Sequence, residues 1–155
     1  MKKLNYLFSL IVLISFLGFI SCGGDGGNDP TIAEQQLANI VGTWATTTSS
    51  DVKLNNNDAP GDWSNFSITF TQQKGVSVAG APTSEVDIFA ISSYETQGSS
   101  ATSFTVVFNN DVNETATVNI NGSNMTMSFT LDEGDKLGAK VLSVEGTWNF
   151  SLVKQ

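Results

Sequence analysis

The chain of 155 residues contains no histidine, no arginine and a single cysteine. The lack of histidine excludes a histidine-based catalytic triad and a zinc site built from histidine and cysteine ligands. The lack of arginine excludes the bidentate guanidinium contact that holds phosphates and carboxylates. One cysteine cannot form an internal disulfide. The fold must therefore rest on packing and hydrogen bonds, and only Asp, Glu, Lys, Tyr, Ser and Thr remain for chemistry.

Positive charge is also scarce. The chain has 15 acidic residues against 7 basic ones, which gives a formal net charge of -8. Proteins that bind nucleic acid show the opposite balance, because a basic face must neutralise phosphates. The composition thus argues against nucleic-acid binding, and against docking on anionic headgroups by charge alone.

The N-terminus has the pattern of an export signal. Lys2 and Lys3 precede an apolar run over residues 7–20, which only Ser9, Ser15 and Gly18 interrupt. A charged start followed by an apolar run of this length is typical of a signal peptide, and a membrane-spanning helix needs about 20 apolar residues. We therefore expect residues 1–21 to be removed.

The residues that follow the run resemble a bacterial lipobox. Phe19-Ile20-Ser21-Cys22 places a small residue before the cysteine, although Phe19 stands where leucine is usual. The resemblance implies cleavage before Cys22 and attachment of a diacylglyceryl group to its sulfur, often with a further acyl chain on the new amine. Two or three acyl chains give a durable anchor, whereas one binds membranes only marginally. The alternative is an ordinary secretory signal with an unmodified cysteine.

This resemblance implies an exported protein, anchored in the envelope of a Gram-negative cell, with the outer membrane expected and the leaflet left open. The glycine-rich segment 22–29 would be a flexible tether. A domain over residues 30–155 would follow it.

One short helix is predicted over residues 30–39. Either Asp29 caps it with Pro30 in the first turn, or Thr31 and Glu34 form a capping box. Its narrow apolar face would consist of Ile32, Ala33, Leu37 and Ile40. We expect this helix to plug one end of a β-barrel.

From Gly42 onward, apolar and polar residues alternate, as in strands with one face on a core and one in water. Further, less regular strands are expected over residues 86–94 and 115–120, and Asn121-Gly122 between two such runs predicts a hairpin. The pattern predicts an all-β fold of about eight strands, an antiparallel up-and-down barrel or a closely related sandwich, with one N-terminal helix. The predicted core is Trp44, Phe66, Ile68, Phe70, Phe104, Val106, Phe108, Met125, Met127, Phe129, Trp148, Phe150 and Leu152.

Gly42-Thr43-Trp44 follows the helix and opens the first strand, and Gly146-Thr147-Trp148 begins the last. A helix, a Gly-x-Trp tripeptide and a meander of short strands resemble the lipocalin-like superfamily. The resemblance implies that Trp44 closes the barrel base under the helix. Because the first and last strands are neighbours in a closed barrel, we expect Trp44 and Trp148 to pack near each other. Lipocalins stack an arginine over the first tryptophan, and here Lys154 is the available substitute.

Two aromatic residues are candidate ligand contacts. Trp63 lies in the polar loop over residues 58–63, where an exposed indole would stack on a sugar or cap a barrel mouth. The simpler interpretation is that it folds back on the core as a loop anchor. Tyr94 beside Glu95 has the same two interpretations, and the structural one is favoured.

Acidic residues suggest two further sites, and solvated turns or faces explain both better. Calcium needs six to eight oxygen ligands, and no segment has the EF-hand pattern. The only plausible catalytic pair is Glu85 with Asp87, on one face of a strand. The loop acids considered for calcium are Asp58, Asp62, Asp132, Glu133 and Asp135. We therefore expect no metal, no cofactor and no catalysis.

Two functions fit these observations. The first, which the resemblance favours, is a lipid-anchored, non-catalytic binding module for a small apolar or glycan ligand, with an interior pocket on the scale of about 300–1,000 Å³. The second is an envelope structural or protein-interaction lipoprotein with a filled barrel and no small-molecule ligand. Apart from the membrane at Cys22, the sequence identifies no partner.

Overall fold

The computed structural model describes residues 29–82, 89–132 and 145–155. The predicted signal over residues 1–21, Cys22 and nearly all of the tether lie outside these residues. So do four of the acidic candidates, namely Glu85, Asp87, Glu133 and Asp135.

The single described helix, α2 (Ile32–Ile40), begins with the second of the two expected caps. The Thr31 hydroxyl accepts a hydrogen bond from the Glu34 backbone N–H, and the Glu34 carboxylate accepts one from the Thr31 N–H at 2.7 Å. The expected apolar face is partly wrong, since Ile32 and Ala33 are exposed while Gln36 and Ile40 are buried. In the described part of the chain, no helix is long and apolar enough to cross a membrane.

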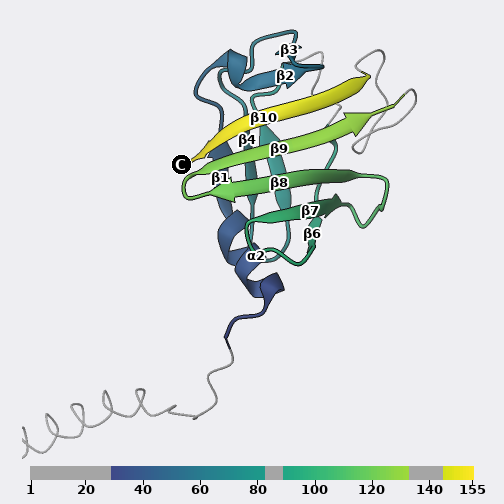
Figure 1. The fold of residues 1–155 in the computed structure, drawn as a ribbon. Coiled ribbons are helices and arrows are strands. Elements are labelled where there is room, and N and C mark those ends of the chain that lie inside the picture. The colour runs from purple at the N-terminus through teal and green to yellow at the C-terminus, as the bar shows by residue number, and fades with distance from the viewer. Residues whose placement is uncertain (1–28, 83–88, 133–144) are drawn as a thin grey trace, which may run out of the picture.

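Antiparallel strands form a nearly closed barrel with α2 at one end (Figure 1). The hydrogen-bonded order is β5-β4-β1-β10-β9-β8-β7-β6, and a bridge between Gly75 and Ser93 joins the two ends of this path. The structure thus confirms the all-β barrel with one short helix. The strands are β1 (Gly42–Ala45), β2 (Val52–Leu54), β3 (Asn57–Asp58), β4 (Ser67–Phe70), β5 (Val76–Ala79), β6 (Tyr94–Gln97), β7 (Ser103–Phe108), β8 (Thr115–Asn121), β9 (Asn124–Leu131) and β10 (Gly146–Lys154), with a 3-10 turn, η1 (Ser49–Asp51), before β2.

The last strand, β10, pairs with both halves of an interrupted first strand. Its beginning lies against β2, with Trp148 opposite Leu54, and its end lies against β1, with Trp44 opposite Lys154. Trp148 is therefore six residues along β10 from the partner of Trp44, a separation of about 20 Å at the usual strand rise. The expectation that the two tryptophans pack together is wrong, because they lie toward opposite ends of the barrel.

The strand expected over residues 86–94 is corrected over residues 89–94, whereas residues 86–88 lie outside the described part of the chain. The regular strand there, β6, begins only at Tyr94, and residues 89–93 hold a 3-10 residue at Phe89 and the single bridge at Ser93. The hairpin predicted at Asn121-Gly122 is confirmed. Asn121 pairs with Asn124, and Gly122 has a φ of 58°, which suits the first central position of a two-residue turn.

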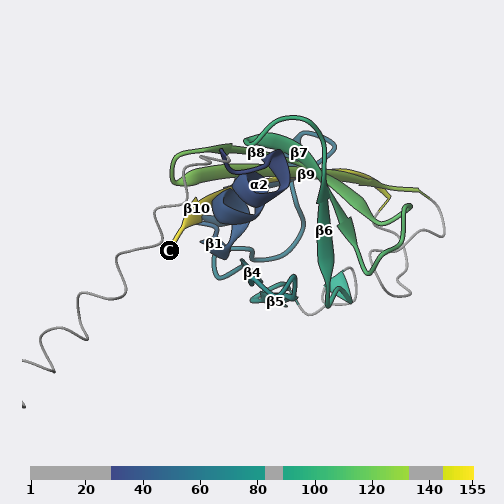
Figure 2. The ribbon, with the colours of Figure 1, turned by 90° about the horizontal axis from the view of Figure 1, so that it is seen from below.

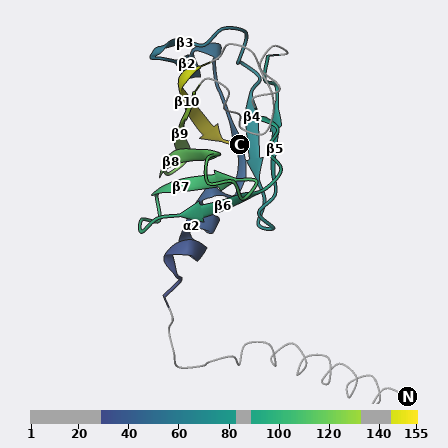
Figure 3. The ribbon, with the colours of Figure 1, turned by 90° about the vertical axis from the view of Figure 1, so that its right-hand side faces the viewer.

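Every residue predicted for the core is buried. Seen from below, α2 lies across one opening of the barrel (Figure 2). Its polar side chains attach it to the β6–β7 loop, since the Gln36 amide donates to the carbonyls of Gly98 and Ser100, and the Asn39 amide donates to that of Ala101. The helix thus plugs one end of the barrel, called here the helix end. The opposite end carries β2 and β3 (Figure 3) and is called the far end.

Candidate functional site

Aromatic side chains occupy the barrel interior toward the far end. Trp63 is at the centre of this group, with ring centroids 5.5 Å from Phe66 and Trp148 and 5.7 Å from Phe150, all in edge-on geometry. Edge-to-face contacts at these distances are the favoured arrangement of aromatic rings. We call the whole group the ring cluster, which consists of Trp63, Phe66, Phe89, Phe129, Trp148 and Phe150.

Trp63 is fully buried. This corrects the expectation of an exposed indole in a polar loop and agrees with its interpretation as a loop anchor. The indole N–H donates to the carbonyl of Pro60 at 2.8 Å, so the polar edge of the ring is satisfied within its own loop. The ring occupies the interior of the barrel toward the far end, among the rings of Phe66, Trp148 and Phe150.

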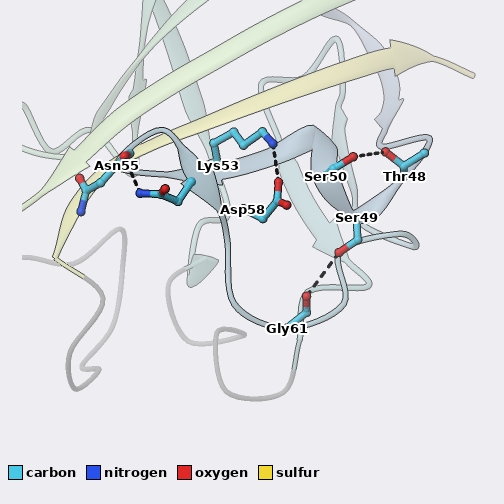
Figure 4. Close-up of polar contacts among 8 residues, drawn as sticks. Thr48, Ser49, Ser50, Lys53, Asn55, Asp58 and Gly61 are labelled. Atoms are coloured by element: carbon cyan, nitrogen blue, oxygen red, sulfur yellow. Dashed lines mark hydrogen bonds and ion pairs between the residues drawn. The ribbon is translucent and has the colours of Figure 1, made fainter.

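The segment that carries Trp63 is held by polar contacts with the residues that follow β1. The Thr46 hydroxyl donates to the Trp63 carbonyl at 2.6 Å, and Ser49 Oγ accepts from the Trp63 backbone N–H. Ser49 Oγ also donates to the Gly61 carbonyl, and an exposed ion pair joins Lys53 to Asp58 (Figure 4). The loop is therefore tied to the barrel both by these bonds and by the buried ring.

The second Gly-x-Trp tripeptide is fixed by a side chain from the β2–β3 turn. Asn55 Oδ1 accepts from the Thr147 N–H, and the Asn55 N–H donates to the Thr147 carbonyl. Gly146 has a φ of 131°, and a Cβ there would lie 2.4 Å from the Asn55 amide. The absence of a side chain at Gly146 thus leaves space for Asn55, and this contact positions Trp148 at the start of β10.

The first Gly-x-Trp tripeptide has different surroundings at the helix end. The Trp44 indole donates to the Ile40 carbonyl at 2.7 Å, and Lys154 Nζ lies 5.0 Å from the centre of the ring. A Cβ on Gly42 would meet Lys154 Cε at 2.9 Å, so the glycine leaves space for the lysine to cross. Lys154 therefore takes the place over Trp44 that the resemblance gives to an arginine.

Tyr94, the second candidate ligand contact, lies apart from Trp63. Its ring packs edge-on against Phe70 at 5.0 Å, and its hydroxyl donates to the Thr71 carbonyl at 2.8 Å. Burial, with a contribution from the Glu95 charge, raises the pKa of Tyr94 to about 12. The phenol therefore stays protonated at neutral pH. Beside it, Lys74 forms an ion pair with Glu95 across the seam between β5 and β6.

Two acidic residues of the described loops accept hydrogen bonds within their own turns. Asp51 accepts from the backbone N–H groups of Thr47 and Thr48, and its pKa is lowered because these hydrogen bonds outweigh the effect of partial burial. Asp62 accepts from the Ser64 N–H, which lowers its pKa as well. Across residues 29–82, 89–132 and 145–155, no three acidic or cysteine side chains gather into a possible metal site.

Three residues of these sites escaped the sequence reasoning. Phe89 joins the ring cluster, Gln36 is a buried polar residue of α2, and Asn55 contacts Thr147, 92 residues along the chain. The only signal in the sequence was the pair Asn55-Asn56, which is typical of a tight turn but does not identify Thr147 as a partner. In the structure both residues have positive φ.

Comparisons with protein-family models, with curated proteins and with solved structures returned no match to this chain.

Proposed function

We propose that this chain is an exported, lipid-anchored and non-catalytic envelope protein whose barrel is filled by its own side chains and meets its partner through the outer surface. The ring cluster carries the proposal, because fully buried Trp63 inserts among four other rings at the barrel mouth. An eight-stranded barrel is just wide enough for side chains to fill it.

The N-terminal sequence supports the anchor, and the position of the helix indicates which end of the barrel it would hold. Residues 1–22 have the order of a lipoprotein signal, and Cys22 is the only cysteine. The described chain begins at Asp29 and enters α2 at the helix end of the barrel (Figure 1). A lipid on Cys22 would therefore tether the helix end toward the membrane and leave the barrel wall and the far end accessible.

Native mass spectrometry tests both parts of the proposal. The full-length gene product is extracted in a non-ionic detergent from cells that process lipoproteins, and its mass is measured before and after denaturation. We expect a chain that starts at Cys22 and carries acyl groups, with the same mass in both states. The Cys22→Ala variant controls for the anchor and is expected to leave the membrane fraction.

Other results would contradict the lipid anchor or the filled barrel separately. An unmodified thiol at Cys22 would remove the lipid anchor and leave a secreted barrel. A small molecule that remains with the native protein and leaves on unfolding would establish the competing function, a binding module for an apolar or glycan ligand. In that case Trp63 would be a ligand contact or a displaceable plug, and the Trp63→Phe variant should change the retained fraction.

A further inference from the structure

The outer wall formed by β8, β9 and β10 carries no acidic residue, although the chain as a whole is strongly acidic. Residues 115–121, 124–131 and 146–154 contain neither Asp nor Glu, and their only cation is Lys154 at the end of β10. All 15 acids of the chain lie elsewhere. Ordinary protein surfaces mix charges of both signs over roughly a quarter to a third of their residues.

Instead, the outward positions at the centre of this wall are short, neutral and polar. Two rows cross the three strands, with Thr117, Ser128 and Asn149 abreast in one and Asn119, Thr126 and Ser151 in the other. Neighbouring strands lie about 4.8 Å apart, so the side chains of each row form a closely spaced array of hydroxyl and amide groups. Thr117, Asn119, Thr126 and Ser151 are exposed. The wall faces the viewer in Figure 1.

This composition argues against a protein, a nucleic acid or another polyanion as the partner of the wall. The buried centre of a protein interface is typically enriched in apolar and aromatic residues, and the two exposed large apolar residues of the described chain, Ile32 and Val112, lie on α2 and in the β7–β8 loop. Nucleic acid needs cations, and a polyanion would be repelled by the net charge of the chain. Hydroxyl and amide groups both donate and accept hydrogen bonds, as the hydroxyls of a sugar do.

We propose that the β8–β10 wall binds a neutral polysaccharide along its two polar rows. This inference rests on the proposed function in one respect, that the partner meets the outer surface. Each hydrogen bond to a solvated hydroxyl contributes little, and affinity comes from many such contacts repeated along one polymer chain. Binding should therefore depend on polymer length and be insensitive to salt, since no charge takes part.

A bead-depletion assay tests the proposal with three neutral polymers and their charged derivatives. The detergent-solubilised full-length protein is mixed with beads of cross-linked dextran, agarose or cellulose, and with the carboxymethylated form of each. We expect depletion from the supernatant by at least one neutral polymer, weaker depletion by its carboxymethylated form, and no loss in high salt.

Matched variants locate the surface without changing charge. Thr117→Ala, Thr126→Ala and Ser151→Ala together remove three hydroxyls from the rows, and we expect the apparent Kd to rise about tenfold or more. The control combines Ser64→Ala, Ser77→Ala and Ser99→Ala, which removes three exposed hydroxyls elsewhere and should leave the Kd unchanged. Urea unfolding of both triple variants verifies that each remains folded.

Three results would overturn the inference: no depletion by any neutral polymer, equal loss of binding in both triple variants, or self-association through the wall in place of polymer binding. The first would leave the filled barrel and the lipid anchor untouched, because those rest on the mass measurements.

Discussion

The two ends of the barrel use the same tripeptide, Gly-Thr-Trp, for different purposes. At the helix end, Trp44 lies under a lysine and donates to the last turn of α2. At the far end, Trp148 is one of six packed rings, and Gly146 leaves space for the side chain of Asn55. The helix end is thus closed by a separate element, whereas the far end is filled from within by a loop. The local sequence determines the strained glycine and the buried ring. The residues that pack around each tryptophan determine how that end of the barrel is closed.

The largest expected effect comes from emptying the far end. Trp63→Ala would remove the ring that contacts four others and leave a cavity among them, which should lower the free energy of unfolding by about 3–5 kcal/mol. Urea unfolding of the purified protein measures this loss. Trp63→Phe keeps an aromatic ring and should cost distinctly less. Equal stability of Trp63→Ala and the unmodified protein would show that the ring cluster does not hold the loop.

The two glycines offer a closer comparison. Both have a φ of 131°, so Gly42→Ala and Gly146→Ala should share a backbone strain of about 1–3 kcal/mol. At Gly42 the new methyl meets the end of a flexible lysine, but at Gly146 it meets the hydrogen-bonded amide of Asn55. We expect Gly146→Ala to cost about 1 kcal/mol more, the net value of a lost hydrogen bond.

A double variant isolates that additional cost. In an Asn55→Ala background the amide is absent, and the two glycine substitutions should become similar in their effect on the urea midpoint. If Gly42→Ala were instead the more damaging change in both backgrounds, Lys154 would be the more rigid neighbour.

Alternation along the strands predicted an antiparallel barrel or sandwich and its buried face, and the capping residues with helical spacing predicted the helix. The inward residues of β7, β9 and β10 follow from period 2 alone, because a buried side chain on one face fixes the whole strand. The ring cluster was not predictable in this way, since Trp63 stands in a segment of Asp, Pro and Gly that reads as an exposed loop. Its burial depends on Thr46 and Ser49, which lie near in space but carry no pattern.

The register of β10 was missed for a related reason. A closed barrel requires its first and last strands to be neighbours, but the offset between them depends on strand tilt. The interruption after Ala45 lets β10 pair with β2 as well as β1, and this interruption separates Trp44 from Trp148.

Alkaline pH should destabilise the packing between β5 and β6, a region that lies between the helix end and the far end of the barrel. The pKa of Tyr94 is raised to about 12 in the folded protein from an ordinary value of 10.0. The folded state therefore favours the neutral phenol, and this contribution is complete below pH 10.0 and lost as the pH rises toward 12. Tyr94 is the only tyrosine after residue 21, so the phenolate absorbance of a chain that starts at Cys22 reports on it alone. Its titration midpoint should fall on unfolding, and Tyr94→Phe should remove this part of the alkaline destabilisation.

The smallest expected effect concerns the cation over Trp44. Lys154→Met keeps the aliphatic stem and removes the ammonium, so the loss should consist of a cation–π contact of about 0.5–1 kcal/mol and the long hydrogen bond that Lys154 Nζ donates to the Asn39 carbonyl. Lys154→Arg should restore this energy or exceed it, because a planar guanidinium stacks on an indole better than an ammonium does. Comparison of the two variants by urea unfolding separates the charge from the packing of the stem. If Lys154→Met were as stable as the unmodified protein, α2 and the Ile40 carbonyl alone would hold Trp44, and the helix end would need no cation to close it.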